Sequence, residues 1–323
     1  MLELKGVSKV YKTGTFGSKD LYAVSDVSFE VRDGEVVSLI GESGSGKTTI
    51  GKMVLGLVSI SSGAIVFNGL DIAGLQGSEL KDYYRRVQGV FQDPFSSYNP
   101  VFKADRIFRI IREEFFPSMG SSEWNAKVEG TLRAVGLNPP DVLNKFPHQL
   151  SGGQLQRFLI ARALLLDIEF LVADEIISML DASTRIDVLN LLADLKARGL
   201  SVLFITHDLS LGYYISERAV ILYRGYVMEM GATEKLYTNP LHPYTKMLMA
   251  AVPRLDRKWE EVEVKLGAAR AEPGQGCVYY ERCPFADKAG CERHKPTLIE
   301  AESDHFVACG RYAKQPPPVY EAL

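Results

Sequence analysis

The chain contains 323 residues, a length that suits one large domain or two smaller ones. Hydrophobic residues make up 46% and charged residues 24%, as in ordinary globular proteins. The net charge of −3 gives no indication of a nucleic-acid or anionic-membrane partner, so a surface of either kind would have to be a local patch. No apolar run reaches the roughly 18 residues that a membrane-spanning helix needs, and we expect no such helix.

The first predicted elements are two strands. Residues 2–10 and 24–31 carry apolar residues at alternate positions, a pattern typical of half-buried strands. Tyr11 comes just before a mostly polar loop that contains two glycines, and its spacing alone favours a packed core residue. The first residues, MLELKGVSKVYK, lack the apolar centre of a signal peptide, so we expect a cytoplasmic protein.

Residues 35–57, EVVSLIGESGSGKTTIGKMVLGL, predict a buried strand, a glycine-rich loop and an amphipathic helix. The loop fits the phosphate-binding pattern G-x-x-x-x-G-K-[ST]. Glycines let backbone N–H groups turn towards an anion, and the helix adds the positive end of its dipole. We predict a nucleoside triphosphate site in which Lys47 reaches the β- and γ-phosphates and Thr48 ligates Mg²⁺; an incidental glycine-rich turn is the alternative. The residues expected to hold the nucleotide are Gly41, Ser43, Gly44, Ser45, Gly46, Lys47, Thr48 and Thr49.

The next stretch combines a strand with a region of helical spacing. Residues 64–67 end in Asn68-Gly69 and predict a strand followed by a tight turn. Residues 78–148 then carry charged and aromatic residues at helical spacing, interrupted by a loop at residues 90–100. Gln92 lies in this loop, where a glutamine alone is usually only solvated.

A second helix start follows at Leu150-Ser151-Gly152-Gly153-Gln154, just before LQRFLIARALLL. Serine and two glycines at a helix start expose a hydroxyl and several N–H groups, which makes a second anion-binding end. An ordinary serine N-cap is the alternative, and nothing local excludes it.

Two more apolar strands end in polar side chains. Residues 170–173 lead into Asp174-Glu175, where α/β proteins bind ligands at the carboxyl ends of parallel strands. Asp174 can hold the Mg²⁺ shell and Glu175 can accept a proton from an attacking water, although a solvated turn would look the same locally. Residues 202–205 end in Thr206-His207-Asp208, and residues 219–223 and 226–230 predict a hairpin.

From about residue 232 the chain leaves the sheet pattern, and all four cysteines lie beyond residue 276. Their spacing is C-x5-C-x7-C-x17-C. Free thiols, a zinc site and an iron–sulfur cluster are the three alternatives. Zinc sites usually use short C-x₂₋₄-C pairs, so the long, uneven spacing favours a four-cysteine cluster and leaves zinc open. The cysteines are Cys277, Cys283, Cys291 and Cys309.

Together these motifs resemble the nucleotide-binding subunit of an ATP-binding-cassette (ABC) transporter. They stand in that family's order: GESGSGKTT (41–49), Gln92, LSGGQ (150–154), FLVADE (170–175), SMLD (178–181) and His207. More narrowly, FQDPFSSYNP (91–100), NPLHPYTKMLMAAVP (239–253) and the cysteine region resemble the oligopeptide/dipeptide importer group, in particular the F-type member of its usual ATPase pair.

The resemblance implies a fold and a division of the chain. The fold class is α/β, with a RecA-like P-loop NTPase core, an antiparallel β subdomain, an inserted helical subdomain and a small cysteine-rich C-terminal tail domain. Residues 1–250 would form the ATPase cassette, with the helical subdomain at about 78–160. Residues 251–323 would form the C-terminal extension.

The resemblance also implies a role for individual residues. Tyr11 would stack on adenine, in place of the packing role that its spacing favours. Thr48 and Gln92 would contact Mg²⁺, and Asp174 would act through the water shell of the ion. Glu175 would be the general base, and His207 would sense the γ-phosphate. The signature residues would close over the ATP held by a partner subunit. The further nucleotide-site residues are Ser151, Gly152, Gly153, Gln154 and Asp181.

The partners implied are a homologous ATPase subunit in a heterodimer, two membrane permeases and an extracytoplasmic solute-binding protein, with no nucleic acid. The chain would then lie at the cytoplasmic face of the membrane and carry ATP, Mg²⁺ and a [4Fe–4S] cluster. Importers of oligosaccharides or nickel are alternatives, as is a soluble cassette ATPase acting on DNA or ribosomes. The chain lacks the coiled-coil insertion, second cassette or basic patch expected of that last class. It departs from the family at Ile168 and at Ile176-Ile177, where proline is common.

Overall fold

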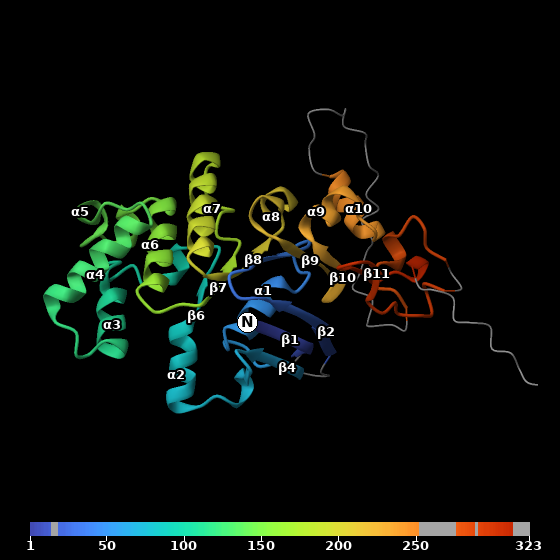
Figure 1. Ribbon diagram of the computed structural model, residues 1–323, viewed down its shortest axis with the longest axis horizontal. Helices are drawn as coiled ribbons and strands as arrows, with labels where there is room; N and C mark the ends of the chain where they lie inside the picture. The colour runs from blue at the N-terminus through green and yellow to red at the C-terminus, as the bar shows by residue number, and fades with distance from the viewer. Residues whose placement is uncertain (14–18, 252–275, 288–289, 313–323) are drawn as a thin grey trace, which may run out of the picture.

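The computed structural model describes residues 1–13, 19–251, 276–287 and 290–312. Within them the chain forms two sheets with helices around them (Figure 1). The larger sheet has eight strands in the order β11-β12-β10-β9-β3-β8-β7-β6, and the smaller has four in the order β2-β1-β4-β5. The expected α/β class and the antiparallel sheet are therefore both confirmed.

The middle of the larger sheet is parallel. Every residue of β3, β7 and β8 is buried, as expected for strands that are covered on both faces. The parallel register runs from β9 through β3, β8 and β7 to β6. These strands are β3 (Val36–Ile40), β6 (Val87–Val90), β7 (Phe170–Asp174), β8 (Ser201–Thr206) and β9 (Arg218–Tyr223).

The smaller sheet covers the helix that follows the glycine-rich loop. Apolar residues of β1, β2 and β4 pack in one cluster with Ile50, Met53 and Val54 of α1 (Lys47–Val54). The expected alternation is therefore real, because one face of this sheet supports α1. Its strands are β1 (Leu2–Thr13), β2 (Lys19–Val31), β4 (Ser62–Phe67) and β5 (Leu70–Asp71).

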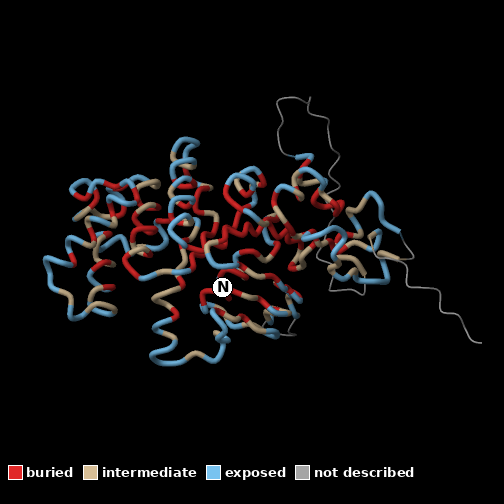
Figure 2. Tube along the Cα trace, viewed as in Figure 1, coloured by how far each residue is buried: buried red, intermediate tan, exposed pale blue. Residues whose placement is uncertain are grey.

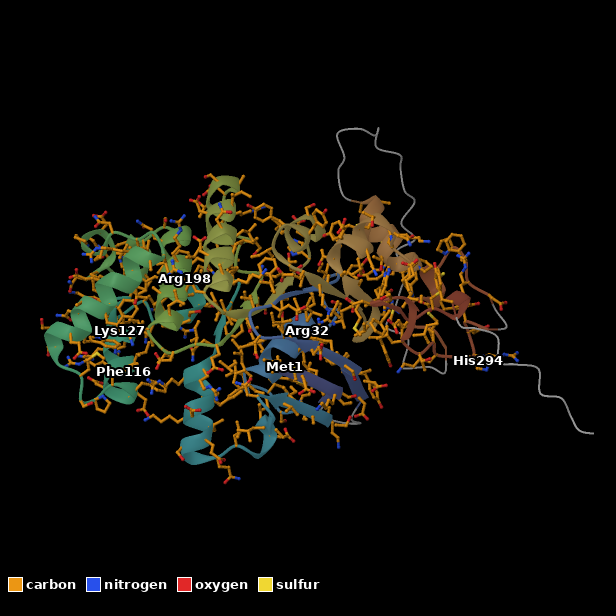
Figure 3. The ribbon with its side chains drawn as sticks, viewed as in Figure 1. Met1, Arg32, Phe116, Lys127, Arg198 and His294 are labelled. Atoms are coloured by element: carbon orange, nitrogen blue, oxygen red, sulfur yellow. The ribbon has the colours of Figure 1, made fainter. Side chains whose placement is uncertain are left out.

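A group of helices lies beyond the β6 edge of the larger sheet (Figure 1). Phe158 of α6 is fully buried and stacks on Phe108 of α3 with ring centroids 4.5 Å apart. On the outer side, the Lys127 ammonium lies 4.1 Å from the centroid of the Phe116 ring (Figure 3). The helices of this group are α3 (Arg106–Phe115), α4 (Ser121–Ala134), α5 (Pro139–Val142) and α6 (Gly152–Leu164). Helix α2 (Gly77–Arg86) precedes β6 in the chain, and α7 (Ala182–Ala197) follows β7.

Strand β6 interrupts a stretch in which only helices and a loop were expected. Its four residues are too few to give a periodic pattern, and Gly89 lowers the strand signal further. A Cβ at Gly89 would lie 2.4 Å from Leu55 Cδ1, so a larger residue there would displace the Leu55 side chain. Because β6 is parallel to β7, its carboxyl end lies at the same end of the sheet as the carboxyl ends of the other parallel strands.

The chain leaves the sheet after Ala232, as expected, but it later returns to the larger sheet through two strands that the sequence did not predict. Strand β12 (His305–Val307) pairs antiparallel with β10 (Tyr226–Ala232), and β11 (Ile299–Glu302) pairs with β12. His305 Nε2 lies 2.7 Å from Glu229 Oε1, and both side chains are fully buried. Strand β12 has only three residues, and its partner β10 lies far earlier in the chain. The sequence therefore shows no periodicity that would predict this pairing.

Buried residues concentrate along the two sheets, whereas the outer faces of the helices are exposed (Figure 2). The remaining helices, α8 (Leu209–Ile215), α9 (Thr233–Thr238) and α10 (Pro243–Ala250), lie beside the β9–β10 hairpin. Among the described residues, no helix is both long and apolar enough to cross a membrane. The extended tail expected at Pro316-Pro317-Pro318 lies outside the described residues.

Candidate nucleotide site

Four parallel strands end at one edge of the larger sheet. The glycine-rich loop follows β3, Gln92 follows β6, Glu175 follows β7 and His207 follows β8. Because these strands are parallel neighbours, the loops after them meet at one edge. This is the edge at which open α/β sheets bind ligands.

Glycine is required at two positions of the loop. A Cβ on Gly41 would lie 2.2 Å from the Leu222 carbonyl oxygen. Gly46 has a φ of +107°, and a Cβ there would lie 2.5 Å from the Ala23 carbonyl oxygen. The loop therefore packs closely against β2 and β9, and only glycine allows that approach. Ser43, Gly44 and Thr48 are exposed on its other side.

Lys47 lies at the centre of the loop with only 4% of its surface exposed. Its ammonium donates hydrogen bonds to the carbonyl oxygens of Gly41 at 2.8 Å and Glu42 at 3.0 Å. Burial lowers the pKa of Lys47, and the charges of Glu175, Asp174 and Glu42 act in the opposite direction. One buried cation is thus placed among three carboxylates.

Asp174 is almost completely buried, and burial raises the pKa of its carboxyl group. A hydrogen bond with the Thr48 side chain and the charge of Lys47 lower that pKa, whereas the charge of Glu175 raises it. Among the described residues, Asp174 Oδ1 has no hydrogen-bond partner. A buried carboxylate oxygen without a partner is costly, and a cation or its bound water would satisfy it.

The oxygen donors at this edge suit Mg²⁺. Thr48 and Asp174 bring a hydroxyl and a carboxylate together, and exposed Gln92 stands at the end of β6. Mg²⁺ is usually held by one or two carboxylates together with substrate phosphates. The described residues contain no cluster of three or more His, Cys, Asp or Glu side chains that could bind a metal.

Glu175 and His207 form a pair beside Asp174. The distance from His207 Nδ1 to Glu175 Oε1 is 3.3 Å, and the histidine side chain is 59% exposed against 18% for the glutamate. Glu175 has a φ of +50°, which is uncommon for a residue with a side chain. Its backbone is fixed by hydrogen bonds to Ile205 O at 2.9 Å and from Ser178 Oγ at 2.9 Å.

Ile176 and Ile177 follow Glu175 where proline is common in the family that the sequence resembles, and both are buried. They are 1% and 2% exposed and belong to the largest apolar cluster, which also contains Leu180. The turn after Glu175 is therefore held by buried side chains as well as by its hydrogen bonds. Ile168 is half-buried against the same cluster.

Two further predicted site residues lie at the surface. Tyr11 is half-buried on β1 opposite Leu21, with the Lys9 ammonium 5.0 Å from the centroid of its ring. Asp181 caps α7 by accepting a hydrogen bond from Thr184 N at 3.0 Å. Hydrogen bonds from Ser183 and Thr184 hold the pKa of Asp181 well below its ordinary value.

The signature residues form the start of α6. Ser151 Oγ accepts from Gln154 N at 3.2 Å, and Gln154 Oε1 accepts from Ser151 N at 2.9 Å. This reciprocal capping box satisfies two of the amide groups at the helix start. A Cβ on Gly153 would lie 2.8 Å from Thr184 Cγ2 of α7, whereas Gly152 has open space. Helix α6 stands apart from α1, with β7 between them (Figure 1).

The four cysteines gather close together without forming a metal-binding group in the described residues. Cys277 N donates to Cys291 O at 2.7 Å. Burial raises the pKa of Cys277 to about 11, and the charges of the other three thiolates raise it further. Burial also raises the pKa of Cys283 and Cys309. The described residues therefore show no metal site on these cysteines.

Sequence analysis does not predict the contact between the glycine-rich loop and the C-terminal part of the chain. Arg282 binds the Glu42 carboxylate across 240 positions of sequence, and Tyr244 bonds to the Glu42 backbone. Glu42 is one of the freely variable positions of the loop pattern, and Arg282 is an ordinary arginine between two cysteines. No local motif marks either residue.

The chain therefore has a strand, glycine loop and helix, with two acidic residues at the end of another parallel strand of the same sheet. These features define a P-loop nucleoside triphosphatase. The solved dimeric cassette MJ0796, bound to ADP and Pi in a post-hydrolysis state, resembles the chain with a TM-score of 0.65 and 30% identity. The similarity covers 72% of this chain and 99% of that one.

Family models and relatives specify the class further. A model described as "ABC transporter" matches residues 24–178, and one described as "Oligopeptide/dipeptide transporter, C-terminal region" matches residues 228–291. The oligopeptide transport ATP-binding protein AppF of Bacillus subtilis is 41% identical over 97% of this chain and 98% of its own length. OppF of Haemophilus influenzae is 39% identical over 90% of this chain and 88% of its own. The chain belongs to the ABC transporter family of ATPases, with a C-terminal region of the oligopeptide/dipeptide transporter type.

Replacing Asp174 by asparagine is expected to stabilise the nucleotide-free protein and to abolish Mg²⁺-dependent hydrolysis. Because burial raises its pKa, the folded state binds more protons than the unfolded state just above the ordinary aspartate range, and stability falls as the pH rises there. Asparagine avoids that loss at pH 7. Calorimetry should find a melting temperature a few degrees higher, since about 1 kcal/mol corresponds to roughly 2–4 °C in domains of comparable size.

The matched control is Asp194→Asn, which changes an exposed aspartate on α7 and should leave the melting temperature unchanged. An Asp174→Asn protein that melts at or below the wild-type temperature would contradict the account of this carboxylate.

Proposed function

We propose that the chain is the ATP-hydrolysing subunit that powers import of oligopeptides or related solutes through separate membrane-spanning subunits. The observation that carries the proposal is the grouping of Lys47, Asp174, Glu175 and His207 at one sheet edge. Relatives named as oligopeptide transport ATP-binding proteins, matched over nearly the whole chain, support the solute class. Oligosaccharide or nickel import remains the second candidate.

A soluble ATPase acting on DNA or ribosomes is less well supported. The C-terminal region matches a transporter family over residues 228–291, and a nucleic-acid enzyme of this family would not need that region. The net charge of −3 also gives no basic footprint for a phosphate backbone.

In the proposed mechanism, the loop after β3 binds the triphosphate. Lys47 exchanges its bonds to the loop carbonyls for bonds to the β- and γ-phosphate oxygens. Thr48, Gln92 and Asp174 would hold Mg²⁺, which supplies neutralisation of charge on the phosphates. Tyr11 would stack on the adenine ring. The remaining nucleotide contacts are proposed for Gly41, Ser43, Gly44, Ser45, Gly46 and Thr49.

Glu175 acts as the general base for the attacking water. It follows Asp174 directly, and its carboxylate is mostly buried beside the exposed His207 imidazole. His207 orients the carboxylate and contacts the γ-phosphate. The strained backbone at Glu175 is held by bonds to β8 and to Ser178, so the carboxylate keeps one orientation towards the reacting water.

We propose that two subunits enclose two nucleotides. Residues 151–154 and Asp181 would face the triphosphate held by the loop of a homologous partner, with a heterodimer as the expected assembly. The separation of α6 from α1 in one chain supports this, because the start of α6 carries the signature residues (Figure 1). The relative MJ0796 is described as dimeric in its ADP and Pi complex.

The cassette is proposed to span residues 1–250, with its helical subdomain at about 78–160 and the extension at 251–323. ATP-driven closure would be passed to two permease subunits near Gln92 and the helical subdomain, and a solute-binding protein would deliver the solute outside. The chain would lie at the cytoplasmic face of the membrane.

We further propose a [4Fe–4S] cluster on Cys277, Cys283, Cys291 and Cys309, with zinc as the alternative. All four cysteines of the chain fall in this one region, and burial raises the pKa of Cys277, Cys283 and Cys309, which favours their neutral thiol forms. Metal binding would release the thiol protons and neutralise the thiolate charges that form. The cluster would have a structural role in a segment too small to build a core of its own.

The Glu175→Gln protein should bind ATP nearly as well as wild type and hydrolyse it very slowly. General-base catalysis typically contributes ~10²–10⁴-fold in rate, so phosphate release should fall by about that factor. Glu234→Gln, which changes an exposed glutamate on α9, is the control and should keep full activity. A rate of phosphate release by Glu175→Gln above about a third of the wild-type rate would contradict the assignment of Glu175 as general base.

The isolated chain should hydrolyse ATP slowly, and a homologous ATPase subunit should stimulate it. Residues 151–154 can complete only another subunit's site, so the specific activity should rise with concentration or with added partner. Phosphate release would be followed across a dilution series with the mass checked by sedimentation. Full activity from a verified monomer at every concentration would rule out the shared site.

Anaerobic purification should give a brown protein with about four irons per chain. Cys291→Ser should lose the colour and most of the iron, because a four-thiolate cluster tolerates the loss of a ligand poorly. Elemental analysis and the visible spectrum are the measurements. A colourless anaerobic protein with one zinc per chain would decide for the alternative metal.

A further inference from the structure

The phosphate loop is tied to the C-terminal region by a forked ion pair. Arg282 Nη1 lies 2.9 Å from Glu42 Oε2, and Arg282 Nη2 lies 3.0 Å from Glu42 Oε1. Arg282 ends a short helical turn, Tyr280–Arg282, and is followed directly by Cys283. Two parallel charge-assisted bonds fix both the distance and the orientation of the partners.

The arginine is held in place by an aromatic platform. The rings of Tyr223, Tyr244 and Tyr279 lie with centroids 4.7–5.4 Å apart. The Arg282 guanidinium lies 5.6 Å from the Tyr223 ring and 5.8 Å from the Tyr279 ring, and its side chain is only 12% exposed. Tyr244 Oη also accepts a hydrogen bond from Glu42 N at 3.1 Å. Both ends of Glu42 are thus fixed by residues outside the loop.

The Glu42 carboxylate lies within electrostatic reach of the Lys47 ammonium. The carbonyl of this residue accepts from the Lys47 ammonium, and its carboxylate charge is felt by that ammonium. A carboxylate at this position would repel phosphate oxygens unless a cation neutralised it. Arg282 is the cation that contacts it.

We propose that Arg282 is a positioning residue for ATP binding: it acts through Glu42, whose carboxylate charge it neutralises beside the phosphate loop. This inference rests on the proposed role of residues 41–49 in binding ATP. It gives the C-terminal region a direct effect on nucleotide affinity. Arg282 does not reach Glu175 or His207 in the described contacts, so it acts on binding and leaves the chemical step alone.

The test compares the ATP affinity and turnover of Arg282→Gln with those of wild type, both as the full-length protein. An unpaired carboxylate beside the phosphates should weaken ATP binding by about tenfold, and added salt should reduce the difference. The kcat at saturating ATP should stay within about twofold of wild type, because only binding energy is lost. Arg293→Gln removes an exposed arginine from the same region and serves as the matched control.

Rescue separates the electrostatic role from a structural one. The double variant Glu42→Gln/Arg282→Gln should regain ATP affinity to within about threefold of wild type, because the repulsive charge is gone. Arg282→Lys should lie between wild type and Arg282→Gln, since lysine keeps the charge but loses the fork. Thermal melting of each variant is recorded beside the binding data.

Wild-type affinity in Arg282→Gln would overturn the inference. So would a loss of affinity that Glu42→Gln fails to rescue, because that result means a structural role. Lys47→Ala is measured in parallel: if it keeps wild-type ATP affinity, the phosphate-loop proposal itself fails. A weakened Lys47→Ala with an unchanged Arg282→Gln contradicts the Arg282 inference alone.

Discussion

The buried ammonium of Lys47 is the interaction on which the rest of the site depends. It is 4% exposed and bonded to the carbonyls of Gly41 and Glu42, with the carboxylates of Asp174, Glu175 and Glu42 in electrostatic reach. A buried cation is tolerable only with such compensation, and the carboxylates in turn need the cation. A triphosphate would bring negative charge to the Lys47 ammonium, and its Mg²⁺ would bring positive charge to the carboxylates. The burial of these charges lowers the stability of the free protein and favours ligand binding.

The fold brings these charges together from distant parts of the chain. Parallel strands place Asp174 and Glu175 at the same end of the sheet as the glycine-rich loop. Close packing at Gly41 and Gly46 holds the loop against β2 and β9. The C-terminal region then adds Arg282, which pairs with the Glu42 carboxylate. The extra strands β11 and β12 join that region to the main sheet, so the arginine is held by the fold as a whole.

Much of the cassette could be predicted from the sequence because its strands are buried on both faces and read as apolar runs, as in residues 170–173. The glycine loop and Asp174-Glu175 could be predicted as site residues because nucleotide binding needs particular residue types at a fixed spacing. Strand β6 was missed because four residues with a glycine carry no period, and β12 because its partner lies 76 residues earlier at the His305–Glu229 pair. The Arg282–Glu42 pair depends on tertiary packing alone, which no local pattern encodes.

The most direct test of the account is a crystal structure of the Glu175→Gln protein with Mg²⁺ and ATP. The account predicts that the Lys47 ammonium leaves the carbonyls of Gly41 and Glu42 for the β- and γ-phosphates. It also predicts Mg²⁺ at about 2.1 Å from the Thr48 hydroxyl oxygen, with Asp174 Oδ1 bonded to a metal-bound water. A lysine that stays on the loop carbonyls, or a metal bound away from Thr48 and Asp174, would contradict it.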